Sequence, residues 1–152
     1  MPTLEDAIKL AVEAHSGQSD PQLPDEPYIL HPLRVMQRLR DAGRSVEVQA
    51  VAVLHDVFER GGMTPDQLLE LGWHPTIVAA VQSVTHDPDE TLEQAAARAA
   101  ADPIGCEVRL ADVYDRLRPE RLAQLSEADA ANERLRLEGV RHLLTRADVV
   151  VP

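Results

Sequence analysis

The sequence predicts a single all-α domain over residues 1–152, and three observations support this prediction. Hydrophobic residues make up 44% of the chain but aromatic residues only 3%, so Leu, Val, Ile and Ala must build the core. Ala and Leu, with the frequent Arg and Glu, are good helix formers. Apolar residues recur at helical spacing between capping residues. No series of alternating segments bounded by turns predicts a sheet. The length fits one ordinary core.

Start and stop signals delimit each expected helix. The expected N-cap residues are Thr3, Ser45, Thr64, Thr91 and Ser126. The expected helices cover residues 3–15, 32–42, 45–60, 64–71, 75–84, 91–101, 103–117 and 126–145. The helix over 45–60 is apolar on most sides, which predicts a central position. The proline-rich stretch 16–30 is expected to be a loop.

Charge and composition narrow the classes of partner. The net charge of −11 disfavours DNA or bulk RNA, because lysine and arginine drive phosphate-backbone binding. A small phosphorylated ligand stays open, since a metal ion and a few arginines can form a positive pocket on an acidic protein. No apolar run is long enough to span a membrane and no signal peptide is recognisable, so we expect a soluble cytoplasmic protein.

The chain end leaves two alternatives open. Residues Val149 to Val151 are apolar. They are expected either to pack on the body of the domain or to lie at a contact between subunits of a homo-oligomer.

The dipeptide His55-Asp56 is the first candidate functional feature. It stands in the apolar run Val51-Ala-Val-Leu-His-Asp-Val, where an unpartnered imidazole or carboxylate would cost several kcal/mol. Either the two side chains form a structural hydrogen-bonded pair, or they bind a cation together. From the dipeptide alone, the structural pair is the preferred interpretation.

Two further segments shift this balance towards a metal centre. His31 ends the run Glu26-Pro-Tyr-Ile-Leu-His just before a helix, and Asp112 lies in the apolar segment Val108-Arg-Leu-Ala-Asp. Two imidazoles and two carboxylates can hold a divalent ion, and mixed nitrogen and oxygen ligands suit Mn, Fe or Zn. Such an ion activates water and polarises phosphoryl oxygens.

Four stretches of the chain resemble the HD-domain superfamily, and specifically the hydrolase domain of the RelA/SpoT family. They are Ala14-His-Ser-Gly-Gln18, Glu26-Pro-Tyr-Ile-Leu-His-Pro32, Ala52-Val-Leu-His-Asp-Val57 and Arg109-Leu-Ala-Asp112. The resemblance covers about residues 4–117 and implies an HD-type helical bundle with a metal site at its centre. It also implies a small stand-alone hydrolase that removes the 3′-pyrophosphate of (p)ppGpp.

The resemblance further implies roles for individual residues. His31, His55, Asp56 and Asp112 would be the ligands of Mn²⁺, or of another divalent transition metal. Glu59 would work beside the metal by orienting or deprotonating the attacking water. Its alternative is a solvated carboxylate at a helix end.

Several positions depart from the family pattern. Arg60, which we group with Glu59 as a candidate catalytic residue, replaces the usual Asp after Glu59. It would either bind a phosphate through a forked contact or remain solvated at a helix end. Arg116 replaces an Asn that contacts substrate, and Arg109 replaces a Lys. Arg118 matches a family Arg.

Two loops correspond to regions that contact the substrate in the family. His86 stands in a loop where the family often has Lys. The loop over residues 19–25 has no Arg or Lys where the family carries a basic residue. Arg109, Arg116, Arg118 and His86 are therefore the candidate substrate-binding residues. The alternative for Asp115, Arg116 and Arg118 is that they form solvated ion pairs.

Three functions remain open at this point. The first is a Mn²⁺-dependent pyrophosphohydrolase acting on (p)ppGpp, and the second is a phosphohydrolase for another nucleotide or phosphate ester. The third is a binding or regulatory module that keeps the metal but has weak catalytic activity. All three imply a small phosphorylated ligand and neither nucleic acid nor a membrane as partner.

Overall fold

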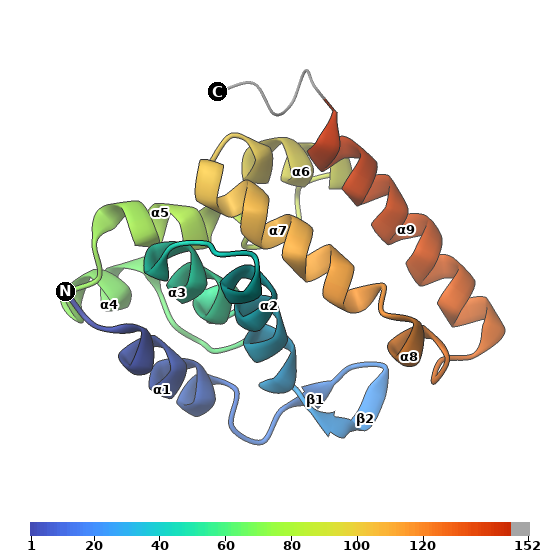
Figure 1. Cartoon of the computed structure of the whole chain (residues 1–152), viewed down its shortest axis with the longest axis horizontal. Helices are drawn as coiled ribbons and strands as arrows, with labels where there is room; N and C mark the ends of the chain where they lie inside the picture. Colours follow the sequence, from blue (N-terminus) through green and yellow to red (C-terminus); the bar gives the residue numbers. More distant parts are fainter. Residues whose placement is uncertain (147–152) are drawn as a thin grey trace.

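A computed structural model describes residues 1–146 and confirms the all-α prediction (Figure 1). Nine helices and one two-stranded hairpin make up this part of the chain. In chain order they are α1 (Leu4–Ala14), β1 (Ser19–Asp20), β2 (Leu23–Pro27), α2 (Leu30–Asp41), α3 (Val46–Leu54), α4 (Pro65–Glu70), α5 (Pro75–Ser83), α6 (Leu92–Ala100), α7 (Pro103–Arg116), α8 (Pro119–Leu122) and α9 (Glu127–Thr145). The apolar segment Val149 to Val151 lies outside the described residues.

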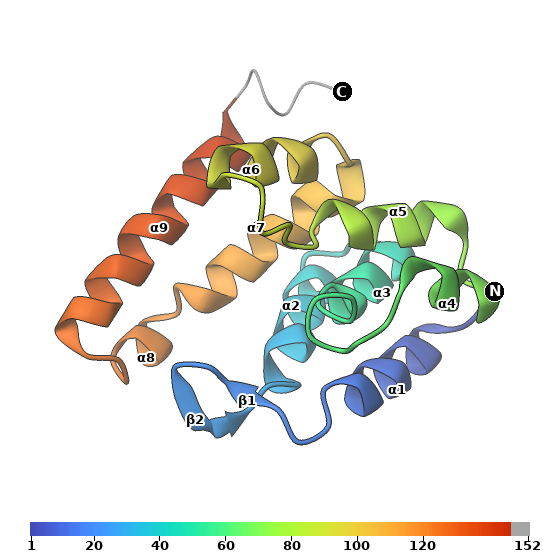
Figure 2. The same ribbon diagram turned by 180° about the vertical axis from the view of Figure 1, so that it is seen from behind.

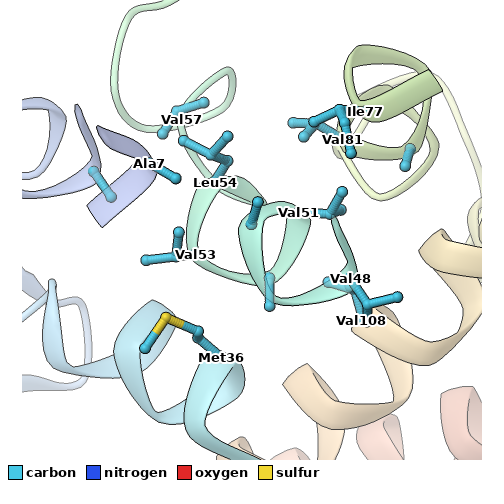
Figure 3. Packing of buried hydrophobic residues seen from close by; sticks show 14 of the residues in the cluster. Ala7, Met36, Val48, Val51, Val53, Leu54, Val57, Ile77, Val81 and Val108 are labelled. Atoms are coloured by element: carbon cyan, nitrogen blue, oxygen red, sulfur yellow. The ribbon is translucent and has the colours of Figure 1, made fainter. Parts of the chain in front are cut away.

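Helix α3 occupies the middle of the larger core, as its sequence predicts. It packs against α1, α2, α5 and α7. Its residues from Val48 to Leu54 are all buried, and Figure 3 shows Val48, Val51, Val53 and Leu54 pointing to different sides of the helix. A helix that is apolar all round is stable only when other elements surround it. This burial fixes the end of α3, where the His55-Asp56 pair begins.

Helix α7 joins the larger core to a smaller one. Val108 and Ala111 belong to the core around α3, whereas Val113 packs with residues of α6 and α9. In both ribbon views α7 lies between α9 on one side and α2 and α3 on the other (Figures 1 and 2). Asp112 therefore lies on a helix that is held on two faces.

Most of the expected helix starts are confirmed. Thr3, Thr64 and Thr91 each form a capping box with the residue three positions later. Ser45 and Ser126 accept hydrogen bonds from backbone N–H groups of the first turn of their helices. These local signals are readable because a cap satisfies N–H groups that the helix itself leaves free.

The expected loop over residues 16–30 is partly wrong, because it contains a β-hairpin. Ser19 pairs with Pro27 and Asp20 with Leu23 in an antiparallel ladder. The hairpin is short and rich in proline, so it lacks the alternation that identifies a strand. Arg121 of α8 fastens it to the helices, since its guanidinium contacts Asp20 at 3.4 Å and Glu133 of α9 at 3.0 Å.

The expected helix over 45–60 is too long, and the physical reason lies at His55. Helix α3 ends at Leu54, and residues 55–60 form turns. The His55 ring Nδ1 lies 2.6 Å from the Ala52 carbonyl oxygen, which would otherwise accept the next hydrogen bond of the helix. Side chains that bond the nearby backbone compete with the helix in this way. The His55-Asp56 pair thus lies on a turn, although its apolar neighbours have helical spacing.

Gly61 is required where this turn approaches α1. A Cβ atom there would lie 2.7 Å from the Val57 carbonyl oxygen and 2.8 Å from Ala14 Cβ. Close approach of two backbones is a characteristic use of glycine. Gly61 therefore lets the turn pack against α1.

No helix among residues 1–146 combines the length and the apolar character needed to cross a membrane.

Leu54→Ala should lower the free energy of unfolding by about 2–5 kcal/mol, the usual cost of a Leu-to-Ala cavity in a packed core. Leu54 is 0% exposed and lies in the core shown in Figure 3. Leu69→Ala is the matched control, because Leu69 is 41% exposed, and it should change stability by less than about 1 kcal/mol. Urea unfolding followed by circular dichroism measures both. Equal losses in the two variants would contradict the central position of α3.

Candidate metal centre

Side chains from three separate segments converge beside the core. His31 lies in the first turn of α2, His55 directly follows α3, and Asp112 lies on α7. Each of the three is buried, and their potential ligand atoms all lie within 4.8 Å of one another. Three of the four metal ligands predicted from the sequence are thus neighbours in space.

The tautomer of His55 directs one lone pair into this cluster. Its Nδ1 lies 2.6 Å from the Ala52 carbonyl oxygen and must donate its proton there. Its buried Nε2 makes no hydrogen bond, although Asp56 Oδ2 lies 3.1 Å and Asp112 Oδ1 3.7 Å away. A lone pair facing carboxylate oxygens is repulsive unless a proton or a metal cation lies between them.

In the absence of a metal, a proton on His55 Nε2 can satisfy the facing carboxylates. Burial by itself would lower the pKa of His55, but the Asp56 and Asp112 carboxylates outweigh it and raise the pKa to about 10. The same acceptors would serve a divalent cation instead, and the cation and the proton compete for one nitrogen.

His31 is oriented by a carboxylate that sequence reasoning left among the solvated ion pairs. Asp115 is only 2% exposed, and its Oδ2 lies 2.6 Å from His31 Nδ1. Arg34 of α2 donates from Nε to Asp115 Oδ1 at 2.8 Å and from Nη2 to Oδ2 at 3.2 Å. This arrangement fixes the proton on Nδ1 and turns Nε2 towards the cluster, as in many histidines that bind metals. The alternative of a solvated ion pair is therefore wrong for Asp115, which is buried.

Asp56, the fourth predicted ligand, lies at the edge of the cluster. Its Oδ2 accepts a hydrogen bond from the buried Tyr28 hydroxyl. Burial and the Asp56 carboxylate both raise the pKa of Tyr28, which therefore stays a donor. The Arg60 guanidinium carbon lies 4.5 Å from the centre of the Tyr28 ring, within the range of a cation–π contact. Tyr28 thus holds both Asp56 and Arg60.

Asp112 carries the most contacts in the cluster. Its Oδ1 lies 2.8 Å from His31 Nε2 and accepts from Arg116 Nε at 2.9 Å, and its Oδ2 accepts from Arg109 at 3.2 Å. Burial alone would raise the pKa of Asp112, but Arg116 and the two imidazoles hold it well below its usual range. These contacts therefore favour the ionised form of Asp112.

The cluster opens into a cavity of about 240 Å³. Asp56 and Asp112 line it, and most of the remaining lining residues are basic or apolar. The other lining residues are Glu59, Arg60, His86, Leu92, Arg109, Arg116, Arg136, Leu137 and Val140. Four arginines beside the carboxylates make this a fitting site for an anionic ligand on an acidic protein.

Glu59 and His86 line this cavity together. The exposed Glu59 carboxylate accepts a hydrogen bond from the His86 backbone N–H at 2.9 Å. This contact ties the loop that follows α5 to the turn that carries Asp56. The roles expected for Glu59 and His86 remain predictions.

The remaining expected substrate contacts divide between two places. Arg109 and Arg116 line the cavity with Arg60. Arg118 does not line it and instead pairs with Asp115 Oδ1 at 3.1 Å. Although Arg118 matches the RelA/SpoT pattern, in this chain its guanidinium supports Asp115.

Sequence reasoning missed other residues of the site for different reasons. Tyr28 was part of the quoted Glu26-Pro-Tyr segment but received no role. Asp115 lies one helical turn after Asp112, a spacing that could have indicated it. Arg136 lines the cavity from α9 and pairs with Glu133 at 2.9 Å. No local signal distinguishes it from other arginines on an amphipathic helix.

The donor set fits a divalent transition ion. It offers two imidazole nitrogens and carboxylate oxygens, the mixture that suits Mn, Fe or Zn. The unpartnered His55 Nε2 points into it, and the second nitrogen of each imidazole is held by Ala52 or Asp115.

Comparison with known proteins agrees with the resemblance drawn from the motifs. A solved structure described as a metazoan ortholog of SpoT that hydrolyses ppGpp superimposes with a TM-score of 0.79, covering 99% of this chain and 92% of that one at 22% identity. The fold is therefore that of the SpoT-type hydrolase, which confirms the predicted HD-type helical bundle.

A curated relative supports the same assignment at the level of sequence. It is a chloroplastic protein of Oryza sativa subsp. japonica, RSH1, named as a GTP diphosphokinase, and it is 34% identical over 82 residues. The match covers 54% of this chain but only 9% of that much longer protein. No family model matches the chain.

Proposed function

We propose that the chain is a divalent-metal-dependent phosphohydrolase that cleaves the 3′-pyrophosphate of (p)ppGpp, with Mn²⁺ as the metal. The convergence of His31, His55 and Asp112 beside a cavity with four arginines carries this proposal. The SpoT-type fold supports the choice of substrate.

The ligand residues divide the work of holding the ion. His31 and His55 would bind it through Nε2, because their Nδ1 atoms are engaged with Asp115 and Ala52. Asp56 and Asp112 would bind it through carboxylate oxygens. When bound, the ion supplies an acidified water and Lewis-acid stabilisation of the phosphoryl oxygens.

The cavity residues would bind and orient the substrate. Arg60, Arg109 and Arg136 face the cavity and can hold phosphate oxygens through forked contacts. Leu137 and Val140 offer an apolar wall to the nucleoside. Glu59 is the candidate base, since its exposed carboxylate can take a proton from the attacking water.

The proposed reaction determines which products an assay should detect. Water attacks the proximal 3′-phosphorus, the bond to the ribose 3′-oxygen breaks, and that oxygen takes up a proton. ppGpp then yields GDP and pyrophosphate, and pppGpp yields GTP and pyrophosphate.

Incubation of the purified chain with Mn²⁺ and ppGpp should release GDP and pyrophosphate in equal amounts, measured by ion-exchange chromatography. EDTA should abolish the release, and excess Mn²⁺ should restore it. A panel of other nucleotides and phosphate esters is tested in parallel. Turnover of another member with ppGpp untouched would contradict the substrate, and no turnover with metal bound would contradict the enzyme.

Departures from the RelA/SpoT pattern support two alternative functions, which the panel tests. Residues 19–25 contain no Arg or Lys and form the hairpin instead of a basic loop. Arg60 and Arg116 stand where the RelA/SpoT pattern has Asp and Asn. A phosphohydrolase for a different nucleotide or ester fits these changes, and a metal-containing binding module fits them if turnover is absent.

A further inference from the structure

The Arg116 guanidinium lies inside the cluster of predicted ligands. Its Nε donates to Asp112 Oδ1 at 2.9 Å, and its Nη2 lies 3.3 Å from His31 Nε2. The same Nη2 lies 3.3 Å from the Tyr28 hydroxyl oxygen, which in turn bonds to Asp56. One cation therefore contacts two predicted ligand atoms and approaches a third through Tyr28.

The contacted atoms are the ones that a metal ion would need. Asp112 Oδ1 is the carboxylate oxygen that lies near the Nε2 atoms of both imidazoles, at 2.8 Å from His31 and 3.7 Å from His55. Arg109 contacts the same carboxylate on its other oxygen, Oδ2, at 3.2 Å. Among the described residues, only Arg116 contacts both Asp112 Oδ1 and His31 Nε2.

Charge balance points the same way. With neutral imidazoles, Asp56 and Asp112 carry two negative charges, which a divalent ion alone neutralises. Arg116 and Arg109 both lie against Asp112 and add positive charge beyond the two charges of the ion. Arg116 contacts the oxygen on the side of the imidazoles, and like charges this close repel. Its side chain also borders the cavity and is 20% exposed, so it can turn outwards.

We propose that Arg116 is an internal cation that competes with the metal. In the metal-free protein it holds Asp112 and His31, and when the ion binds it turns into the cavity, where it is available to a substrate phosphate. This inference rests on the proposed metal centre and adds a residue that lowers its affinity. Metal and phosphate then favour the same outward position of Arg116.

Arg116→Gln should bind Mn²⁺ at least about tenfold more tightly than the wild type, the scale on which groups around a metal site change its affinity. The same variant should melt at a lower temperature in EDTA, because Asp112 loses its partner, and should gain more from added Mn²⁺. Titration followed by the electron paramagnetic resonance signal of free Mn²⁺ gives the affinity without any substrate. Arg116→Met, which keeps the apolar stem, serves if the glutamine variant does not fold.

Arg109→Gln is the matched control. It removes one positive charge from the same carboxylate but vacates no position beside His31, so its affinity for Mn²⁺ should rise far less. An equal rise in both variants would overturn the competition, since net charge alone would explain it. An unchanged or weaker affinity in Arg116→Gln would also overturn it, while leaving the metal centre intact. Absence of Mn²⁺ binding in every variant would instead contradict the proposed function and the inference with it.

Discussion

Asp56→Ala is expected to abolish Mn²⁺ binding and reduce pyrophosphate release from ppGpp by more than about 100-fold. Outer partners of metal ligands are already worth about 10–100-fold in affinity or activity, so loss of a ligand should exceed that range. Asp56 also provides the carboxylate that Tyr28 bonds and that lies 3.1 Å from His55 Nε2. Mn²⁺ titration and product chromatography measure the two losses separately.

Two further variants make this result interpretable. Asp56→Asn keeps the shape and can accept the Tyr28 hydrogen bond, but it lacks the charge, and it should lose metal and activity with less loss of stability. Asp41→Asn changes an exposed carboxylate that accepts a hydrogen bond from Gln37 at 2.8 Å, and this variant should behave like the wild type. Wild-type activity in either Asp56 variant would contradict the assignment of Asp56 as a ligand.

The helices were predictable from the sequence because their signals are local. A threonine or serine cap followed by an apolar stripe needs no knowledge of the rest of the chain. The hairpin was not predictable in this way, because it is held by a distant residue, Arg121 of α8, which pairs with Asp20 and with Glu133 of α9. The end of α3 depended on a single competition, between the His55 ring and the backbone for the Ala52 carbonyl.

The candidate site shows the same division. His31, His55 and Asp112 could be found because polar residues in apolar surroundings need a partner. Their arrangement came from packing, since α2, α3 and α7 must first meet. Asp115 and Arg116 surround Asp112 at helical spacing, and only the packing of α2 beside α7 decides that both face His31. The position of Arg136 depends on how α9 crosses the cavity.

Asp115→Ala should weaken Mn²⁺ binding by about 10–100-fold, although Asp115 is not proposed to touch the ion. Its carboxylate holds the His31 Nδ1 proton and is itself held by Arg34. Without it, His31 can turn or take the other tautomer, so Nε2 no longer presents a fixed lone pair. We also expect a loss of about 3 kcal/mol in the free energy of unfolding, because the buried His31 and the partly exposed Arg34 lose their common partner.

A conservative variant separates the two effects of Asp115. Asp115→Asn can still accept a hydrogen bond from His31 Nδ1, so it should recover most of the stability and part of the affinity. Glu107→Gln on the same helix breaks an exposed pair with Arg44 of 2.7 Å and should alter neither. The support of His31 by Asp115 predicts that affinity falls in the order wild type, Asn, Ala. Wild-type Mn²⁺ affinity in a folded Asp115→Ala protein would contradict this support, because metal binding would then not depend on Asp115.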